Sequence, residues 1–249
     1  MFVIFFLMVG LAWLVVGVRQ APSREGRAIL SAIRDNGLAH YWGENWAQQY
    51  IHRSTSGREM VGIRLQASVD DEGVWQGREE WVIPEWQLRA AVQWKSSNDA
   101  AQGVYRGQVL SPARSDVQVI YEGRELKVVD NLRQAALTVT AEENFLPSPL
   151  QRIAMIEVFR RGKPARFDII SYQSPVTHPA TIFGSVFMTP GESSVTVLHS
   201  GQMGGFKRVY HFDDEGQVER IDMEDGSSLI RVPLPAPAPT RASVPLDAA

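Results

Sequence analysis

The stretch VQVIYEGRELKVV at residues 117–129 contains the pattern on which the fold depends. Two runs rich in β-branched residues flank the pair Glu122-Gly123, and apolar positions largely alternate with polar ones on either side. Such alternation is typical of half-buried strands, and a short glycine-bearing turn joins antiparallel neighbours. The stretch therefore predicts a β-hairpin.

The same pattern recurs along most of the chain. Turns such as STSG at 54–57 and DDEG at 70–73 and 213–216 separate short segments rich in Val, Ile, Tyr, Phe, Trp and Thr. Strands are expected near 46–53, 58–69, 73–83, 86–94, 103–110, 115–121, 124–130, 135–141, 165–173, 180–189, 194–199, 205–213, 217–223 and 228–232. We therefore expect a mainly β protein with a large curved antiparallel sheet or open barrel.

Two segments have helical periodicity. Residues 148–161 begin with Ser148 as an N-cap and end before Gly162, which predicts a helix packed against one face of the sheet. Residues 22–37 predict a shorter helix that begins at Ser23 and ends at an Asn-Gly pair.

The chain opens with 18 residues that carry no charge, MFVIFFLMVGLAWLVVGV. At helical rise these residues span about 27 Å, close to the roughly 30 Å of a bilayer core. No basic residue precedes the apolar run and the sequence after it is a poor cleavage site, so an uncleaved anchor is favoured over a leader. The predicted organisation is a transmembrane anchor at 1–18, a juxtamembrane helix and linker at 19–45, an antiparallel β domain at 46–232 and a Pro-rich disordered tail at 233–249.

The side of the membrane on which the body lies is predicted differently by two arguments. Four arginines, at positions 19, 24, 27 and 34, follow the apolar span, and the positive-inside rule alone would place them and the body in the cytoplasm. Bacterial chains with one N-terminal anchor and a β-rich body are more often exported. We favour an extracytoplasmic, periplasmic body and keep the alternative open.

Composition excludes several classes of function. The formal net charge is −3, and 25 Lys and Arg are scattered among 28 Asp and Glu, which argues against nucleic-acid binding. The chain has no cysteine, so disulfides, thiolate metal sites and a cysteine nucleophile are excluded. The five histidines show no metal-ligand spacing, and no serine-hydrolase or phosphate-loop motif is present. The sequence therefore predicts no cofactor, no metal and no recognisable catalytic residue.

Six tryptophans fall within about fifty residues, between positions 42 and 94. Such a density is typical of a stacked core, of a binding surface or of a membrane-interface belt. The core is the simpler interpretation. If a protein partner binds here, Trp75, Trp81 and Trp86 are the candidate surface residues.

The segment TIFGSVFM at 181–188 is apolar on both alternating faces, so something must cover each side of this strand. A helix with a second layer, or a hydrophobic ligand, would satisfy that need. The candidate residues for a ligand cavity are Phe183, Val186, Phe187, Met155 and Phe159.

The layout over roughly residues 46–232 resembles periplasmic carriers of the lipoprotein-localisation type. The segment WAQQYIHRSTSGREMVGIRLQAS, with Trp46, Tyr50, Gly57 and Gly62, is also similar to the opening hairpin of exported bacterial β domains of unknown function. The first resemblance implies a curved antiparallel sheet around an apolar cavity for acyl chains, with helices as a lid.

Three classes of function follow from these observations. We expect first a non-enzymatic, membrane-anchored accessory, scaffolding or assembly subunit, whose partners are the lipid bilayer and another membrane protein or complex. The first alternative is a carrier-like protein that binds lipid or a lipoprotein in an apolar cavity. The second alternative is an enzyme whose site is assembled from residues distant in the sequence.

Overall fold

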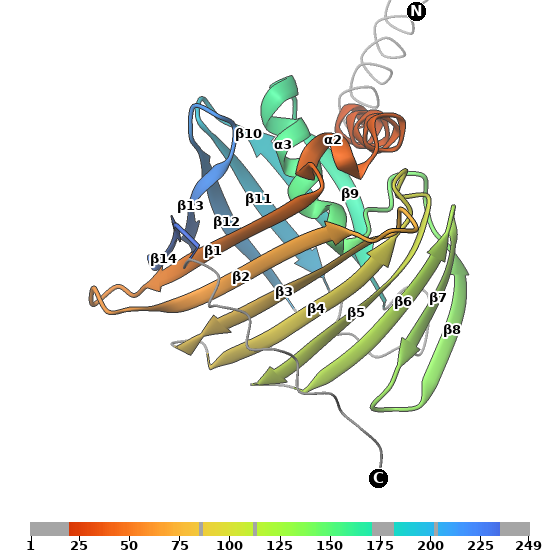
Figure 1. Ribbon diagram of the computed structural model, residues 1–249, viewed down its shortest axis with the longest axis horizontal. Coiled ribbons are helices and arrows are strands. Elements are labelled where there is room, and N and C mark those ends of the chain that lie inside the picture. The colour runs from red at the N-terminus through yellow and green to blue at the C-terminus, as the bar shows by residue number, and fades with distance from the viewer. Residues whose placement is uncertain (1–19, 85–86, 112–113, 171–181, 202–203, 235–249) are drawn as a thin grey trace, which may run out of the picture.

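The computed structural model describes residues 20–84, 87–111, 114–170, 182–201 and 204–234. In these residues 14 strands form one antiparallel sheet, which curves into an open barrel with helices at one end (Figure 1). The first eight strands are β1 (Asn45–Arg53), β2 (Glu59–Val69), β3 (Trp75–Ile83), β4 (Leu88–Ser96), β5 (Gln102–Ser111), β6 (Ser115–Glu122), β7 (Glu125–Asp130) and β8 (Ala135–Thr140). The last six are β9 (Ala165–Ile170), β10 (Phe183–Pro190), β11 (Ser194–Gly201), β12 (Gly204–Phe212), β13 (Val218–Met223) and β14 (Ser228–Val232).

Each strand pairs with its neighbour along the chain within two meanders, β1 to β8 and β9 to β14. The first and last strands join the two meanders, with Ile51 opposite Ile230. The edges of the sheet are therefore β8 and β9. The predicted mainly β fold with a large antiparallel sheet is confirmed, with several strand ends shifted by a few residues.

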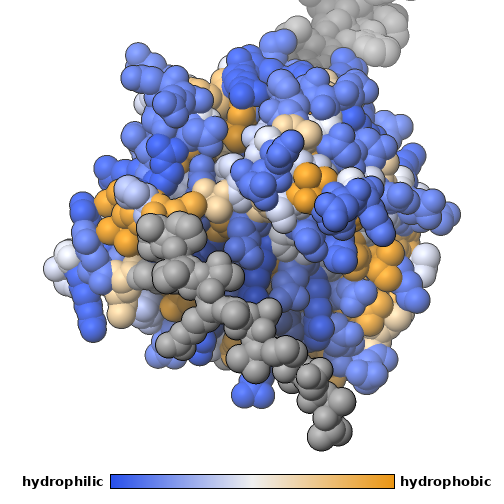
Figure 2. Space-filling model, in the orientation of Figure 1, coloured by the Kyte–Doolittle hydropathy of each residue, from blue (hydrophilic) through white to orange (hydrophobic). Residues whose placement is uncertain are grey.

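The register puts apolar and polar residues on opposite faces of the first meander. One inward row across successive strands consists of Trp46, Ala67, Gly77, Trp94, Tyr105 and Val119. The adjacent outward row consists of Ala47, Gln66, Arg78, Gln93, Arg106 and Gln118. Hydrophilic residues accordingly predominate on the face of the molecule in Figure 2. Alternation along each strand thus decides which side of the sheet forms the core.

Glycine at position 77 makes room for an indole within the inward row. A Cβ atom at Gly77 would lie 2.3 Å from ring carbons of Trp94. The Trp94 ring instead packs 5.1 Å from that of Trp42, which also contacts Trp46 and Trp75. The tryptophan density therefore forms, in large part, a stacked core at the helical end of the barrel.

The helices close this end. Residues 20–36 are helical, α2 spans Leu38–Trp42, and a 3-10 turn at Ser148–Leu150 leads into α3 (Gln151–Arg161). Helix 20–36 packs onto the body, because Ile29 and Ile33 are fully buried. An ion pair of 3.2 Å between Arg161 and Glu25 links this helix to α3.

The sequence predicted the ends of these helices better than their starts. Gly162 adopts a left-handed conformation, φ 62°, and ends α3 as expected. Two capping predictions were wrong: Ser23 lies inside a helix that includes residue 20, and Ser148 starts a 3-10 turn instead of capping α3. The short helix α2 was not predicted.

Parts of the predicted organisation lie outside the described residues. These are the anchor at 1–18, most of the Pro-rich tail at 233–249, and Trp86. Among the described residues, no helix combines the length and the apolar character needed to cross a membrane.

Candidate functional site

A cavity of about 360 Å³ lies inside the open barrel, bounded by both meanders and by α3. Its volume falls within the roughly 300–1,000 Å³ that is typical of small-molecule sites. Its walls are mainly apolar, and residues such as Ile63, Leu65, Val92, Met155, Met188 and Val197 contribute to them. The cavity is therefore suited to an apolar ligand.

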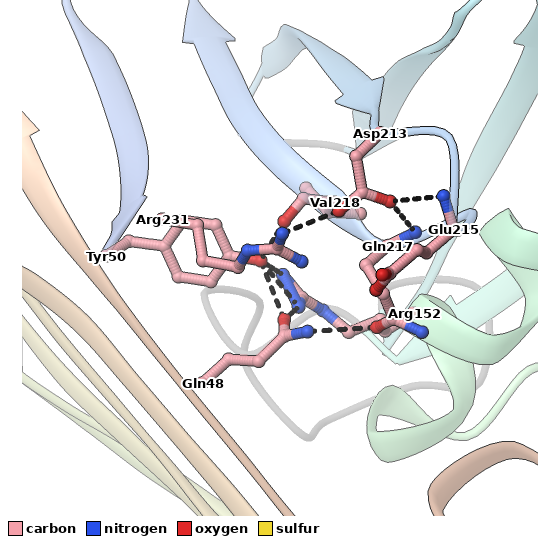
Figure 3. A network of polar contacts seen from close by, with 8 residues as sticks. All are labelled: Gln48, Tyr50, Arg152, Asp213, Glu215, Gln217, Val218 and Arg231. Atoms are coloured by element: carbon pink, nitrogen blue, oxygen red, sulfur yellow. Dashed lines mark hydrogen bonds and ion pairs between the residues drawn. The ribbon is translucent and has the colours of Figure 1, made fainter. Parts of the chain in front are cut away.

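Arg152, at the start of α3, contributes a positive charge to the inner end of this cavity. Its guanidinium donates to the side-chain oxygen of Gln48, and both Nη atoms lie 2.9 Å from the hydroxyl of Tyr50 (Figure 3). The Tyr50 hydroxyl also lies 2.8 Å from the carbonyl oxygen of Val218. The guanidinium stands over the rings of Trp46 and Tyr50, at 5.5 and 5.1 Å. Arg152 is thus held in place by β1.

The network continues towards the β12–β13 turn. The Gln48 amide nitrogen donates to the side chain of Gln217 at 3.0 Å. Asp213 accepts the backbone N–H of Gln217 at 2.8 Å and binds Arg231 on β14 at 2.5 Å. The DDEG turn at 213–216 therefore anchors the strands that join the two meanders.

Glu79 is a carboxyl group in the wall of an apolar cavity. Burial raises the pKa of the Glu79 carboxyl, and the positive charge of Arg152 opposes that rise. Glu79 and Glu80 are neighbours on β3, and neighbouring side chains of a strand point to opposite faces of the sheet. Glu79 accordingly lines the interior, whereas Glu80 pairs with Arg78 at 2.5 Å on the outer face.

A second cation lies near the open end of the cavity. The guanidinium of Arg208, on β12, lies 4.8 Å from the ring centroid of Trp81 and 4.5 Å from that of Phe206. The imidazole of His199, on β11, stacks on the ring of Phe206, with 4.2 Å between the two ring centroids. The Phe206 side chain is 42 % exposed, so this cluster marks the mouth of the cavity.

His199 is neutral at physiological pH. Burial, reinforced by the neighbouring positive charge of Arg208, lowers the pKa of the imidazole to about 3. Arg208 therefore supplies a permanent positive charge at the mouth, beside the rings of Trp81, Phe206 and His199.

The predicted ligand residues divide between the cavity and its surroundings. Met155 lines the cavity. Val186 is fully buried, on the same face of β10 as Met188, and supports the wall. Phe187 is on the opposite face of that strand from Val186.

Two predicted aromatic residues pack elsewhere and do not line the cavity. Phe159 stacks on Phe212 at 4.3 Å with nearly parallel rings. Phe183 meets Phe145 edge to face at 6.5 Å.

The three residues predicted for a partner surface have different surroundings. Trp75 is only 1 % exposed, because it belongs to the tryptophan core, so its ring offers no surface to a partner. Trp81 is half-buried and lines the cavity. Trp86 lies outside the described residues.

The sequence did not identify Arg152, Arg208 or Glu79 as site residues. Each is a charged residue on a helix or strand whose inner face is otherwise apolar. A charged residue at a position where the periodicity of the element predicts an apolar one is the signal that could have identified them. As for metals, the described part of the chain has no cluster of three or more His, Asp and Glu that could hold an ion.

The comparisons with known proteins define a class of fold, an open, β-barrel-like antiparallel sheet. No known sequence family matches the chain, and no curated protein matches it. The fold is similar to that of a β-barrel-like protein of the domain of unknown function DUF1849 from Brucella abortus, with a TM-score of 0.50 and 11 % identity over 75 % of this chain and 94 % of that one. A protein of the DUF1089 family from Pseudomonas aeruginosa aligns with a TM-score of 0.38 and 15 % identity over 68 % and 92 % of the two chains. The first likeness supports the fold alone, and the second is too low to carry an argument.

Proposed function

We propose that this protein binds a single apolar chain, such as the acyl chain of a lipid or lipoprotein, inside the open barrel. The observation that carries the proposal is the cavity of about 360 Å³ with mainly apolar walls from both meanders and α3. Burying apolar surface contributes about 25 cal/mol per Å², so a chain of many methylenes binds such a site without specific contacts.

Neighbouring residues on β4 provide a test with a matched control. Ala90 lines the cavity opposite Trp81 and Val109, whereas the next residue, Ala91, faces outward opposite Glu80. The full chain in phosphatidylcholine nanodiscs is dialysed against radiolabelled hexadecanol, with empty nanodiscs as the blank. We expect the wild type and Ala91→Trp to retain hexadecanol above the blank, and Ala90→Trp to lose most of that excess. No excess in the wild type, or equal retention by the two variants, would overturn the proposal.

A second function, the accessory or assembly subunit expected from the sequence, is supported by the edge strand β8. Its six residues, AALTVT, carry no charge, and among the described residues no strand pairs with its outer side. Uncharged open edges can accept an extended segment of a partner. A membrane-embedded partner protein would then add a strand there. Crosslinking at Thr138, with Thr189 on the inner strand β10 as control, should capture one such partner from the native membrane; recovery of the same proteins at both positions would contradict this function.

A further inference from the structure

The Arg208 side chain reaches into the mouth of the cavity without a carboxylate partner in the described part of the chain. Its Nε atom is buried, and none of the described residues supplies a hydrogen-bond acceptor for it. A buried donor without an acceptor costs roughly 1–3 kcal/mol, more when it is charged, so such groups commonly have a partner in the functional state. Arg208 therefore has a donor that is available to a ligand.

The geometry around Arg208 favours an acceptor that approaches the edge of the guanidinium. The rings of Trp81 and Phe206 lie within 4.8 Å of its central carbon. An arginine placed against aromatic rings keeps its in-plane N–H groups free for oxygen atoms, which suits the two oxygens of a carboxylate or phosphate.

The two ends of the cavity differ in what they can offer to an anion. At the inner end, the guanidinium of Arg152 already donates hydrogen bonds to Gln48 and Tyr50. At the mouth, Arg208 has an unused donor beside the exposed ring of Phe206. An anionic head group therefore fits at the mouth, with its apolar chain directed towards Met155.

We propose that Arg208 binds the anionic oxygen head group of a single-chain amphiphile whose tail occupies the cavity. This proposal rests on the chain-binding function above and names the class of ligand. The head group is a carboxylate or a phosphate, and the tail is a single alkyl chain.

The test compares head groups on one chain length. Full-length protein in phosphatidylcholine nanodiscs is titrated with hexadecanoate, hexadecyl phosphate, hexadecanol and hexadecyltrimethylammonium. Hexadecanoate or hexadecyl phosphate should bind at least about tenfold more tightly than hexadecanol, because one charge-assisted hydrogen bond contributes about that much affinity. The preferred anion distinguishes a carboxylate head from a phosphate head.

Variants assign the preference to a residue. Arg208→Met should abolish it, Arg208→Lys should retain part of it, and Lys207→Met, the adjacent exposed cation on the opposite face, should leave it unchanged. Melting curves verify that each variant is folded.

A brominated chain tests the orientation. The fluorescence of Trp81 is the component of the emission that is lost in Trp81→Phe. Bromine at carbon 2 of hexadecanoate should quench this component more strongly than bromine at carbon 16. Three results would overturn the head-group proposal: equal affinity for hexadecanoate, hexadecyl phosphate and hexadecanol, an unchanged preference in Arg208→Met, or stronger quenching from carbon 16. In each case, binding of hexadecanol would still support the chain-binding function proposed above. Absence of binding by every chain would overturn both.

Discussion

Replacing His199 should make the folded protein less sensitive to acid. The pKa of this imidazole is about 3 in the folded protein, because the ring is buried and lies near Arg208, against about 6.5 when unfolded. Between these values the unfolded chain binds a proton that the folded protein does not, so stability falls as the pH drops through this window. The contribution is regained only above about pH 6.5.

The magnitude follows from the width of the window. Each pH unit contributes about 1.4 kcal/mol, and the distance from pH 6.5 to pH 5 is about 1.5 units, which gives about 2 kcal/mol as an upper value. The ring is partly accessible, so solvent reduces the effect to about 1–2 kcal/mol. This is a sizeable fraction of the roughly 5–15 kcal/mol typical of a folded domain.

Urea unfolding of the full chain at pH 8 and pH 5 measures the effect. Between these pH values, the free energy of unfolding of His199→Gln should fall by about 1–2 kcal/mol less than that of the wild type. His40→Gln, the same change at an exposed position, should behave like the wild type. Parallel losses in the wild type and His199→Gln would refute the reasoning.

Three further substitutions test the packing and the networks. Gly77→Ala should destabilise the protein by about 2 kcal/mol, because its Cβ would lie 2.3 Å from Trp94; an unchanged urea midpoint would show that the indole can move freely. Tyr50→Phe should cost about 1–2 kcal/mol in urea unfolding, because it removes a buried hydroxyl that lies 2.8 Å from the Val218 carbonyl; full stability would mean that this hydroxyl contributes nothing. Asp116→Asn should lower the free energy of unfolding by about 1 kcal/mol at pH 7, because an arginine holds the pKa of this carboxyl well below its usual range. The difference from the wild type should shrink as the pH falls below about 4, the pKa of the unfolded chain. A constant difference at all pH values would contradict this prediction.

The strands could be predicted from sequence because their turns have local signals. The hairpin around Gly123 is found between β6 and β7, with Gly123 at φ 58°, as a tight turn requires. The helix α2 has only five residues, too few for a periodic pattern.

The candidate site could not be predicted in the same way. In GGFKRVYHF the adjacent charges Lys207 and Arg208 are locally equivalent, and only the register with β11 and β13 shows which one enters the barrel. The cavity likewise depends on two meanders that are far apart in the sequence. Phe159 and Phe187 were predicted as ligand residues from their apolar character alone, and neither of them lines the cavity.

The pairing of β1 with β14 has a consequence for how the chain acquires its fold. Every other neighbouring pair of strands is consecutive in sequence, so each meander can assemble from local contacts, which form fast. Joining Ile51 to Ile230 closes a loop of nearly the whole body and must come late. Until then the inward face of the first meander, already synthesised, stays exposed to aggregation. A cell that makes this protein therefore has to shield eight completed strands while the C-terminal ones emerge.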